Sequence, residues 1–153
     1  MRSRVRLPYD PAVTSRLLTV AGVQVPSFVY GTAWKELETE RLTRLALEAA
    51  RVVQADYPDG VWLAELAPLA DPTHVPAAVA GALGVGEQPG RALTETLATW
   101  LASKHLLLVL DNCEHLLDGV APFLERLLGR CPGVGVLATS QARLMLPFEH
   151  VFP

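Results

Sequence analysis

Residues 106–115 read LLLVLDNCEH, an apolar run that stops abruptly at an aspartate. An apolar run of this length is typical of a strand buried on both faces of a parallel sheet. Asp111 would then stand at the carboxyl end of the strand, which is the edge where open α/β sheets bind ligands. The aspartate could hold a magnesium ion there, or it could merely end the strand or cap the following helix.

The segments around this strand alternate between extended and helical patterns. Up to Gly31 the short apolar runs predict a hairpin followed by a strand. Further strands are predicted at Val61–Leu66 and in VGVLATS, residues 134–140. Helical spacing predicts an alanine-rich helix that ends at GALGVG, a helix carrying Leu93, Leu97 and Leu101, and a helix carrying Leu116, Val120, Phe123, Leu124 and Leu127. This order of elements is typical of an α/β domain with a parallel sheet covered by helices.

A longer helix is predicted to begin at Glu36 and to end near DYPDG after about five turns. Apolar residues recur along it at helical spacing, with charged residues between them. The apolar positions are Leu42, Leu45, Ala49, Val52 and Val53. We therefore expect an amphipathic helix that packs against the sheet.

Composition limits the class of protein and its partners. The chain has 153 residues, of which 50% are hydrophobic and 19% charged, as expected for one compact domain. A net charge of -3 gives no general attraction for nucleic acid, so we expect no direct nucleic-acid binding. The sequence shows no apolar stretch long enough for a membrane span and no secretory signal, so we expect a cytoplasmic protein without membrane contact.

Three stretches are similar to one family: residues 59–85, residues 106–140 (LLLVLDNCEHLLDGVAPFLERLLGRCPGVGVLATS) and residues 147–153 (PFEHVFP). In order and spacing they resemble the NB-ARC-like ATPase domain of the STAND class, found in bacterial transcriptional regulators of the LuxR and SARP types. The resemblance covers about residues 43–153. It implies an incomplete three-layer sheet of the P-loop NTPase type, preceded by an extended hairpin and strand. It also implies a regulatory module that binds ATP or ADP with Mg and acts on other protein domains or by self-association.

The resemblance assigns roles to particular residues. Asp111 would be the Walker B aspartate and a magnesium ligand, and Asn112 and Glu114 would flank the attacking water or the metal shell. Thr139 and Ser140 would belong to the sensor strand next to the nucleotide. Thr43 would be the phosphate-loop threonine, which binds both phosphate and Mg.

The phosphate-binding loop itself is missing from the sequence. A P-loop needs G-x-x-x-x-G-K-[ST], because backbone N–H groups wrap the phosphates and the lysine neutralises their oxygens. Where the family has GKT, this chain has Arg41, Leu42 and Thr43. Lys35 lacks the P-loop spacing after Gly31, and three glutamates between residues 36 and 40 would repel phosphate. We therefore expect weak nucleotide binding and little or no ATPase activity.

The start of the chain resembles a different family. Residues 23–49, VQVPSFVYGTAWKELETERLTRLALEA, are similar to the opening of aldo/keto reductases. That resemblance would place Gly31, Thr32 and Trp34 near an NADP-type cofactor, but the catalytic residues of that family find no match here. The chain would then divide into a reductase-like segment 1–42 and a partial ATPase domain 43–153. The alternatives to a regulatory module are a reductase-derived fragment with an NADP-type remnant and an inert chimeric fragment.

Two further groups of residues have more than one interpretation. A zinc site could be assembled from Cys113, His115, Cys131 and His150, but the spacing lacks any paired ligand motif, which favours free cysteines packed against helices. Trp100 lies beside the leucines of its predicted helix. Those residues could bind a partner helix, although the pattern favours packing in the core.

Overall fold

The computed structural model describes the backbone of residues 17–20, 23–26, 28–31 and 36–152. A five-stranded sheet forms its centre, with strand order β4-β5-β6-β3-β7 and every neighbouring pair parallel. Its strands are β3 (Phe28–Gly31), β4 (Val61–Glu65), β5 (Leu106–Asp111), β6 (Val134–Thr139) and β7 (Val151–Phe152). A separate antiparallel hairpin consists of β1 (Leu17–Val20) and β2 (Val23–Pro26).

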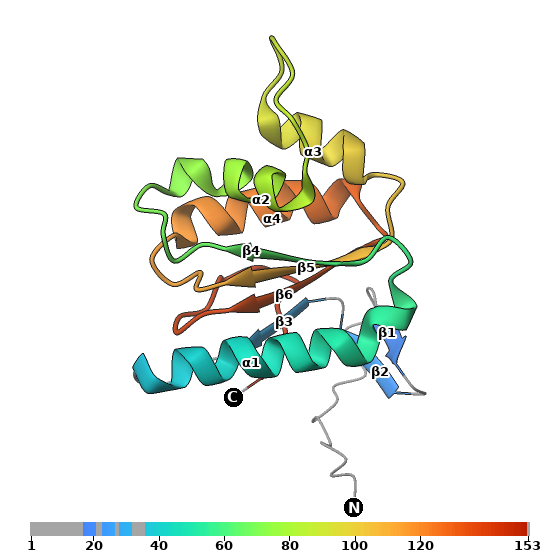
Figure 1. The fold of residues 1–153 in the computed structure, drawn as a ribbon, viewed down its shortest axis with the longest axis vertical. Helices are drawn as coiled ribbons and strands as arrows, with labels where there is room; N and C mark the ends of the chain where they lie inside the picture. The colour runs from blue at the N-terminus through green and yellow to red at the C-terminus, as the bar shows by residue number, and fades with distance from the viewer. Residues whose placement is uncertain (1–16, 21–22, 27, 32–35, 153) are drawn as a thin grey trace, which may run out of the picture.

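Helices cover both faces of the sheet, as Figure 1 shows. One face packs against α1 (Glu36–Val53), and the other against α2 (Val75–Leu83), α3 (Leu93–Leu101) and α4 (Leu117–Arg130). Strand β5 alternates between the two cores, because successive side chains of a strand point to opposite faces. Leu106, Leu108 and Leu110 pack with α2–α4, whereas Leu107 and Val109 pack with α1. The predicted fold class, a three-layer α/β domain around a parallel sheet, is confirmed.

The start of α4 packs tightly against the loop that follows β4. A Cβ atom on Gly119 would lie 2.2 Å from the carbonyl oxygen of Pro72, so only glycine allows this approach. Pro72 opens the short 3-10 turn Pro72–His74, whose Asp71 caps it by accepting from the Thr73 N–H at 2.8 Å. Helix α4 therefore begins in a fixed place, directly after the turn that follows Asp111.

The predicted helices and strands are confirmed, with one difference in α1. The predicted apolar face of α1 is wrong at two described positions, since Ala49 is exposed and Val52 is 69% exposed, whereas Val53 is partly buried and packs against the core as predicted. Ala46 and Ala50 are buried instead, against Leu107, Val109 and Leu137. Small side chains let the helix lie close to the strands, and a pattern that weighs leucine and valine most heavily does not detect such a face. The side chains of Leu42 and Leu45 lie outside the described residues.

The expected boundary between residues 42 and 43 falls inside α1. Strand β3, on its N-terminal side, pairs with β6 and β7, on its C-terminal side. Both segments therefore contribute to a single sheet. Within the described part of the chain, none of the helices combines the length and the apolar character that crossing a membrane demands.

Candidate functional site

The carboxyl edge of the sheet contains a change in the direction of the chain. After β3 the chain enters α1 on one face, whereas after β6 it packs Leu144 and Leu146 into the core on the other face. Strands β3 and β6 are neighbours in the sheet, and the connections that follow them leave toward opposite faces. Such a switch point is where open α/β sheets form a ligand-binding crevice.

The strand register brings the last residues of four strands into one row. Glu65 of β4 pairs with Asp111 of β5, and Thr139 of β6 pairs with Gly31 of β3. Leu110 pairs with Ala138, so the next residues, Asp111 and Thr139, also lie side by side. The row places Asp111 one strand away from the switch point.

Asp111 and Thr139 are joined by a short hydrogen bond. The hydroxyl Oγ1 of Thr139 donates to Oδ1 of Asp111 at 2.5 Å. The Thr139 Oγ1 atom also accepts from the backbone N–H of Asn112 at 2.9 Å. Thr139 is 5% exposed. One buried hydroxyl therefore fixes both the carboxylate of Asp111 and the start of the turn that follows it.

The turn after Asp111 has one strained backbone conformation and is held by hydrogen bonds to Thr139. Asn112 has φ of 66°, in the left-handed region that asparagine tolerates better than most residues. The N–H of Cys113 donates to the carbonyl oxygen of Thr139 at 2.9 Å. One backbone–backbone bond, from Cys113, and one bond from the Asn112 N–H to the Thr139 hydroxyl thus hold the turn against the end of β6.

The side chain of Asn112 faces His115 rather than Asp111. Its Nδ2 lies 3.3 Å from His115 Nδ1, and His115 Nε2 lies 2.9 Å from the carbonyl oxygen of Leu69. A carbonyl oxygen can only accept, so Nε2 carries the proton and Nδ1 accepts from the asparagine amide. These two hydrogen bonds connect the turn after β5 to the loop after β4.

Glu114 and Ser140 lie at the same edge with different surroundings. The Oε2 atom of Glu114 is buried and has no hydrogen-bond partner. Ser140 closes a tight turn, because its Oγ donates to the carbonyl oxygen of Ala142 at 2.8 Å and accepts from the Ala142 N–H at 3.2 Å. The hydroxyl of Ser140 is thus used within its own loop.

Thr43 lies in the middle of α1, and its side chain is outside the described residues. It follows Glu36, the first residue of α1, by seven positions, which is about 10 Å along the helix axis. A phosphate loop places its lysine and threonine at the very start of the helix. The other predicted residues of this region, Thr32, Trp34 and Lys35, also lie outside the described residues.

The two cysteines are buried, and neither forms a disulfide. Cys131 Sγ donates to the carbonyl oxygen of Ala98 at 3.4 Å, deep in the core. Burial, followed by the charges of Glu114 and Asp111, raises the pKa of the Cys113 thiol well above its usual range. Among the described residues, no group of three or more His, Cys, Asp and Glu side chains could hold a metal ion.

The described side chains at this edge are acidic. Glu65, Asp111 and Glu114 carry carboxyl groups, and the turn from residue 112 to residue 115 has no lysine or arginine. Arg143 is exposed on the loop after β6. A magnesium ion binds through one or two carboxylates together with the phosphates of its substrate. Asp111 therefore fits an ion that arrives with a nucleotide, but the described edge offers phosphate little positive charge.

Sequence reasoning missed the role of His115. It was considered only as a zinc ligand, whereas it connects Asn112 to a carbonyl oxygen 46 positions earlier in the chain. A backbone acceptor leaves no mark on the sequence, so no residue pattern could have revealed this bond. The same limit applies to Ser140, whose partner is again a carbonyl oxygen.

In sequence, the chain is similar to segments of longer bacterial proteins. No protein-family model matches it. A protein of Mycobacterium tuberculosis named "Putative HTH-type transcriptional regulator" is 41% identical over 99 residues, which are 65% of this chain and 11% of that protein. A Mycobacterium tuberculosis protein named "Uncharacterized protein" is 36% identical over 107 residues, 70% of this chain and 27% of that protein. Proteins of the same names from Mycobacterium bovis match to the same extent.

Among solved structures, the ORC2 protein of Aeropyrum pernix, in ADPNP–ADP complexes, is 16% identical with a TM-score of 0.43, over 74% of this chain and 34% of that chain. This chain spans only 11% of the length of the first relatives and 27% of the second. It is therefore similar to one segment of larger proteins, some of which are named as transcriptional regulators.

Proposed function

We propose that this chain is a nucleotide-responsive regulatory module of a larger transcriptional regulator, with Asp111 as the residue that faces a magnesium–nucleotide complex. The observation that carries the proposal is the pairing of Asp111 with Thr139 at the carboxyl edge, beside the switch point. A bound magnesium ion would neutralise phosphate charge next to this carboxylate. The name of the mycobacterial relatives supports the regulatory part.

The contacts around Asp111 suit a binding role. Thr139 holds one carboxylate oxygen, which fixes the rotamer of Asp111 before any ligand arrives. A group held in advance loses less conformational entropy on binding. The bonds from Asn112 and Cys113 to Thr139 keep the following turn from shifting when charge is added nearby. Asp111 and Thr139 are thus the two residues that we assign to the metal and nucleotide edge.

Binding should be weak, and hydrolysis slow or absent. Leu42 replaces the lysine that would neutralise the phosphates, and a charged hydrogen bond of this kind is worth about 1.5–3 kcal/mol. That loss weakens affinity by roughly ten- to a hundredfold. The three glutamates in the first five residues of α1 add unfavourable charge where a phosphate would meet the helix. We therefore propose a sensor of nucleotide rather than an efficient ATPase.

The module would act through other parts of a longer protein. The matched segment is 11% of the relatives named as transcriptional regulators, so DNA contact would belong to other segments. The net charge of -3 agrees with a module that does not itself attract DNA. Its partners would be neighbouring protein domains or a second copy of the chain.

Calorimetric titration with ATP and ADP, with and without magnesium, tests the proposal. The variant Asp111→Asn removes the charge, keeps the size of the side chain and retains one oxygen that can accept from the Thr139 hydroxyl. Glu125→Gln is the matched control, since it removes one carboxylate from an exposed position on α4. We expect magnesium-dependent binding with a dissociation constant of roughly 0.1–1 mM that is lost in Asp111→Asn and kept in Glu125→Gln.

Several results would contradict the proposal. Equal affinity in Asp111→Asn and wild type would place the nucleotide elsewhere. Binding of NADPH without binding of ATP or ADP would favour the reductase-derived alternative. No detectable binding of any of these nucleotides would leave an inert domain. Rapid ATP turnover would refute the idea of a sensor without efficient hydrolysis.

A further inference from the structure

We infer that the open edge of β4 and the outer face of α2 together form a surface that binds a second copy of this chain. Strand β4 lies at one border of the sheet, as the strand order and Figure 1 show. Helix α2 packs on this strand, since Val75, Val79 and Ala80 share a core with Ala64 and Leu66. The strand edge and the helix therefore belong to one continuous surface.

The backbone groups along the open edge of β4 have no partner among the described residues. On the other side of the strand, Leu107 N–H donates to the carbonyl oxygen of Gly60, and Leu66 N–H donates to that of Asp111, both at 3.0 Å. Backbone groups alternate in direction along a strand, so the even-numbered residues from 60 to 66 face β5. The N–H and C=O groups that point outward belong to Val61, Leu63 and Glu65.

This edge lacks the features that keep edge strands from pairing. Proteins protect such edges with prolines, lysines or bulges, whereas Val61–Glu65 has none of these and pairs with β5 at five consecutive residues. Val61, Trp62 and Leu63 are only partly buried, so apolar side chains are accessible on both faces of the strand. An exposed apolar edge of this kind is a site for pairing with another strand.

Helix α2 presents an uncharged outer face beside this edge. Its nine residues, VPAAVAGAL, include no polar side chain, and a helix that is apolar all round is normally buried. Nevertheless Ala77 and Gly81 are exposed, and a Cβ atom on Gly81 would meet no neighbouring segment within 4 Å. The distance between two packed helices depends on the side chains at their contact, and small residues allow a close approach. The outer face of α2 therefore suits packing against a second helix.

The pattern of β4 favours a second copy as the occupant of this surface. If two copies of the strand pair antiparallel about Leu63, that residue pairs with its counterpart, and Val61 pairs with Glu65 of the second copy. All the outward N–H and C=O groups of both strands then have partners. Trp62 lies opposite Ala64 of the second copy in this register, so a large side chain meets a small one.

The charges agree with antiparallel pairing. Glu65 carries the single charge of the strand and lies at its end. Antiparallel pairing holds the two Glu65 residues about 14 Å apart, whereas parallel pairing would place them side by side. Antiparallel pairing also relates the copies by a two-fold axis perpendicular to the sheet, so both α2 helices lie on the same face and meet there.

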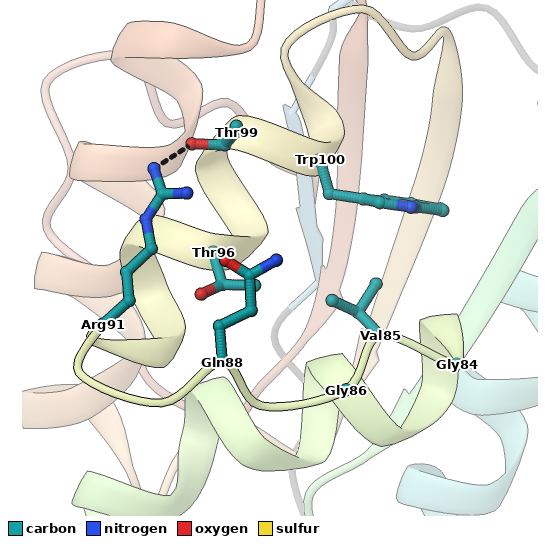
Figure 2. Close-up of a pocket in the computed structure, with 8 residues that line it drawn as sticks. All are labelled: Gly84, Val85, Gly86, Gln88, Arg91, Thr96, Thr99 and Trp100. Atoms are coloured by element: carbon teal, nitrogen blue, oxygen red, sulfur yellow. Dashed lines mark hydrogen bonds between the residues drawn. The ribbon is translucent and has the colours of Figure 1, made fainter.

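Trp100, the exposed aromatic residue of α3, does not belong to this surface. It is 37% exposed, although the sequence pattern favoured packing in the core. In Figure 2 its indole lies over Val85, in the connection between α2 and α3, and Lys104 Nζ lies 5.3 Å from the ring centroid. Contacts within the chain therefore account for the position of the indole.

Sedimentation velocity of the full chain without nucleotide, from about 10 µM to about 1 mM, tests the inference. We expect a weak dimer of two 16.5 kDa chains, with a dissociation constant on the order of 100 µM, because the surface is small. Ala77→Glu should weaken the dimer roughly tenfold or more, because it brings two like charges into an apolar contact. Ala49→Glu is the matched control: it adds the same charge at an exposed alanine of α1, on the other face of the sheet, and should leave the dimer unchanged.

Two further variants examine the strand itself. Val61→Pro removes an outward N–H, and proline is tolerated as the first residue of a strand, so the chain should still fold and the dimer should weaken roughly tenfold or more. Far-ultraviolet circular dichroism checks that each variant folds. A spin label on Glu65→Cys measures the register, because Cys113 and Cys131 are buried and should stay unlabelled. The two labelled Cα atoms should lie about 14 Å apart in the dimer.

A chain that stays monomeric throughout this concentration range would overturn the inference. A dimer that survives both Ala77→Glu and Val61→Pro, or that Ala49→Glu weakens as much as Ala77→Glu does, would overturn it as well. Labels separated by more than about 25 Å would contradict the antiparallel register. The inference selects the second copy from the partners proposed above for the regulatory module. Because the measurements use no nucleotide, their failure is distinct from a failure of nucleotide binding at Asp111.

Discussion

Replacing Thr139 with valine should destabilise the domain, because one hydroxyl serves two partners at the carboxyl edge. It donates to the carboxylate of Asp111 at 2.5 Å and accepts from the N–H of Asn112 at 2.9 Å. Valine has nearly the same shape, so the lost bonds dominate the change. A hydrogen bond to a charged group contributes about 1.5–3 kcal/mol, and an unsatisfied buried N–H costs about 1–3 kcal/mol. Allowing for water at the half-buried Asp111, we expect a loss of about 2–4 kcal/mol in the free energy of unfolding.

Urea denaturation monitored by circular dichroism measures this loss. With an m-value of about 2 kcal/mol/M, the midpoint should fall by about 1–2 M. Thr139→Ser keeps the hydroxyl and loses only a methyl group, so it should cost about 1 kcal/mol. If Thr139→Val proved as stable as Thr139→Ser, the hydroxyl would not hold the edge together, and the reasoning about a fixed Asp111 would be refuted.

Four other predictions concern positions with unusual backbone, packing or charge. Asn112→Ala should lower stability by about 1 kcal/mol more than Asn112→Gly, because both variants lose the bond to His115 and only alanine is strained at φ of 66°; thermal unfolding of both variants decides this. Gly135→Ala would bring a Cβ atom within 2.3 Å of the Tyr57 hydroxyl, so it should destabilise wild type more than it destabilises Tyr57→Phe, and additive effects in a double-mutant cycle would contradict the contact. Burial, followed by the charge of Asp56, raises the pKa of Tyr57 to about 12 from 10.0, so stability should fall between these pH values as the unfolded chain releases its proton first, and Tyr57→Phe should lack this fall. The His105 N–H, and then Lys104, lower the pKa of Asp59, so the stabilisation it gives should be present at neutral pH and lost on acidification through the lowered pKa; an Asp59→Asn variant whose deficit persisted at low pH would argue against this.

The longer strands of the sheet were predictable because each has a run of apolar residues that is visible in the sequence. All of Leu106–Leu110 is buried, and only a strand covered on both faces sustains such a run. Gly84, φ 69°, ends α2 within the predicted GALGVG stretch. The two-residue strand β7 could not be predicted, since two residues give no periodicity and pair only because β3 lies beside them.

The candidate site was only partly predictable. The sequence predicted Asp111 at the end of its strand, and the register brings Thr139 beside it because both strands end in the same row. The link from Asn112 through His115 to Leu69 could not be foreseen, because it depends on how two loops meet. The exposure of Trp100 is equally a result of tertiary structure: its neighbours Leu97 and Leu101 fill the inner face of α3, and Trp100 lies on the outer side.

The central claim is that the carboxylate of Asp111 faces a metal–nucleotide complex, and paramagnetic manganese tests it most directly. Manganese replaces magnesium at oxygen ligands and broadens the NMR signals of nearby nuclei. With ADP present, we expect Mn²⁺ to broaden the amide signals of Asn112 and Thr139 selectively in wild type and not in Asp111→Asn. Broadening that survives in Asp111→Asn, or that misses both amides, would contradict the claim.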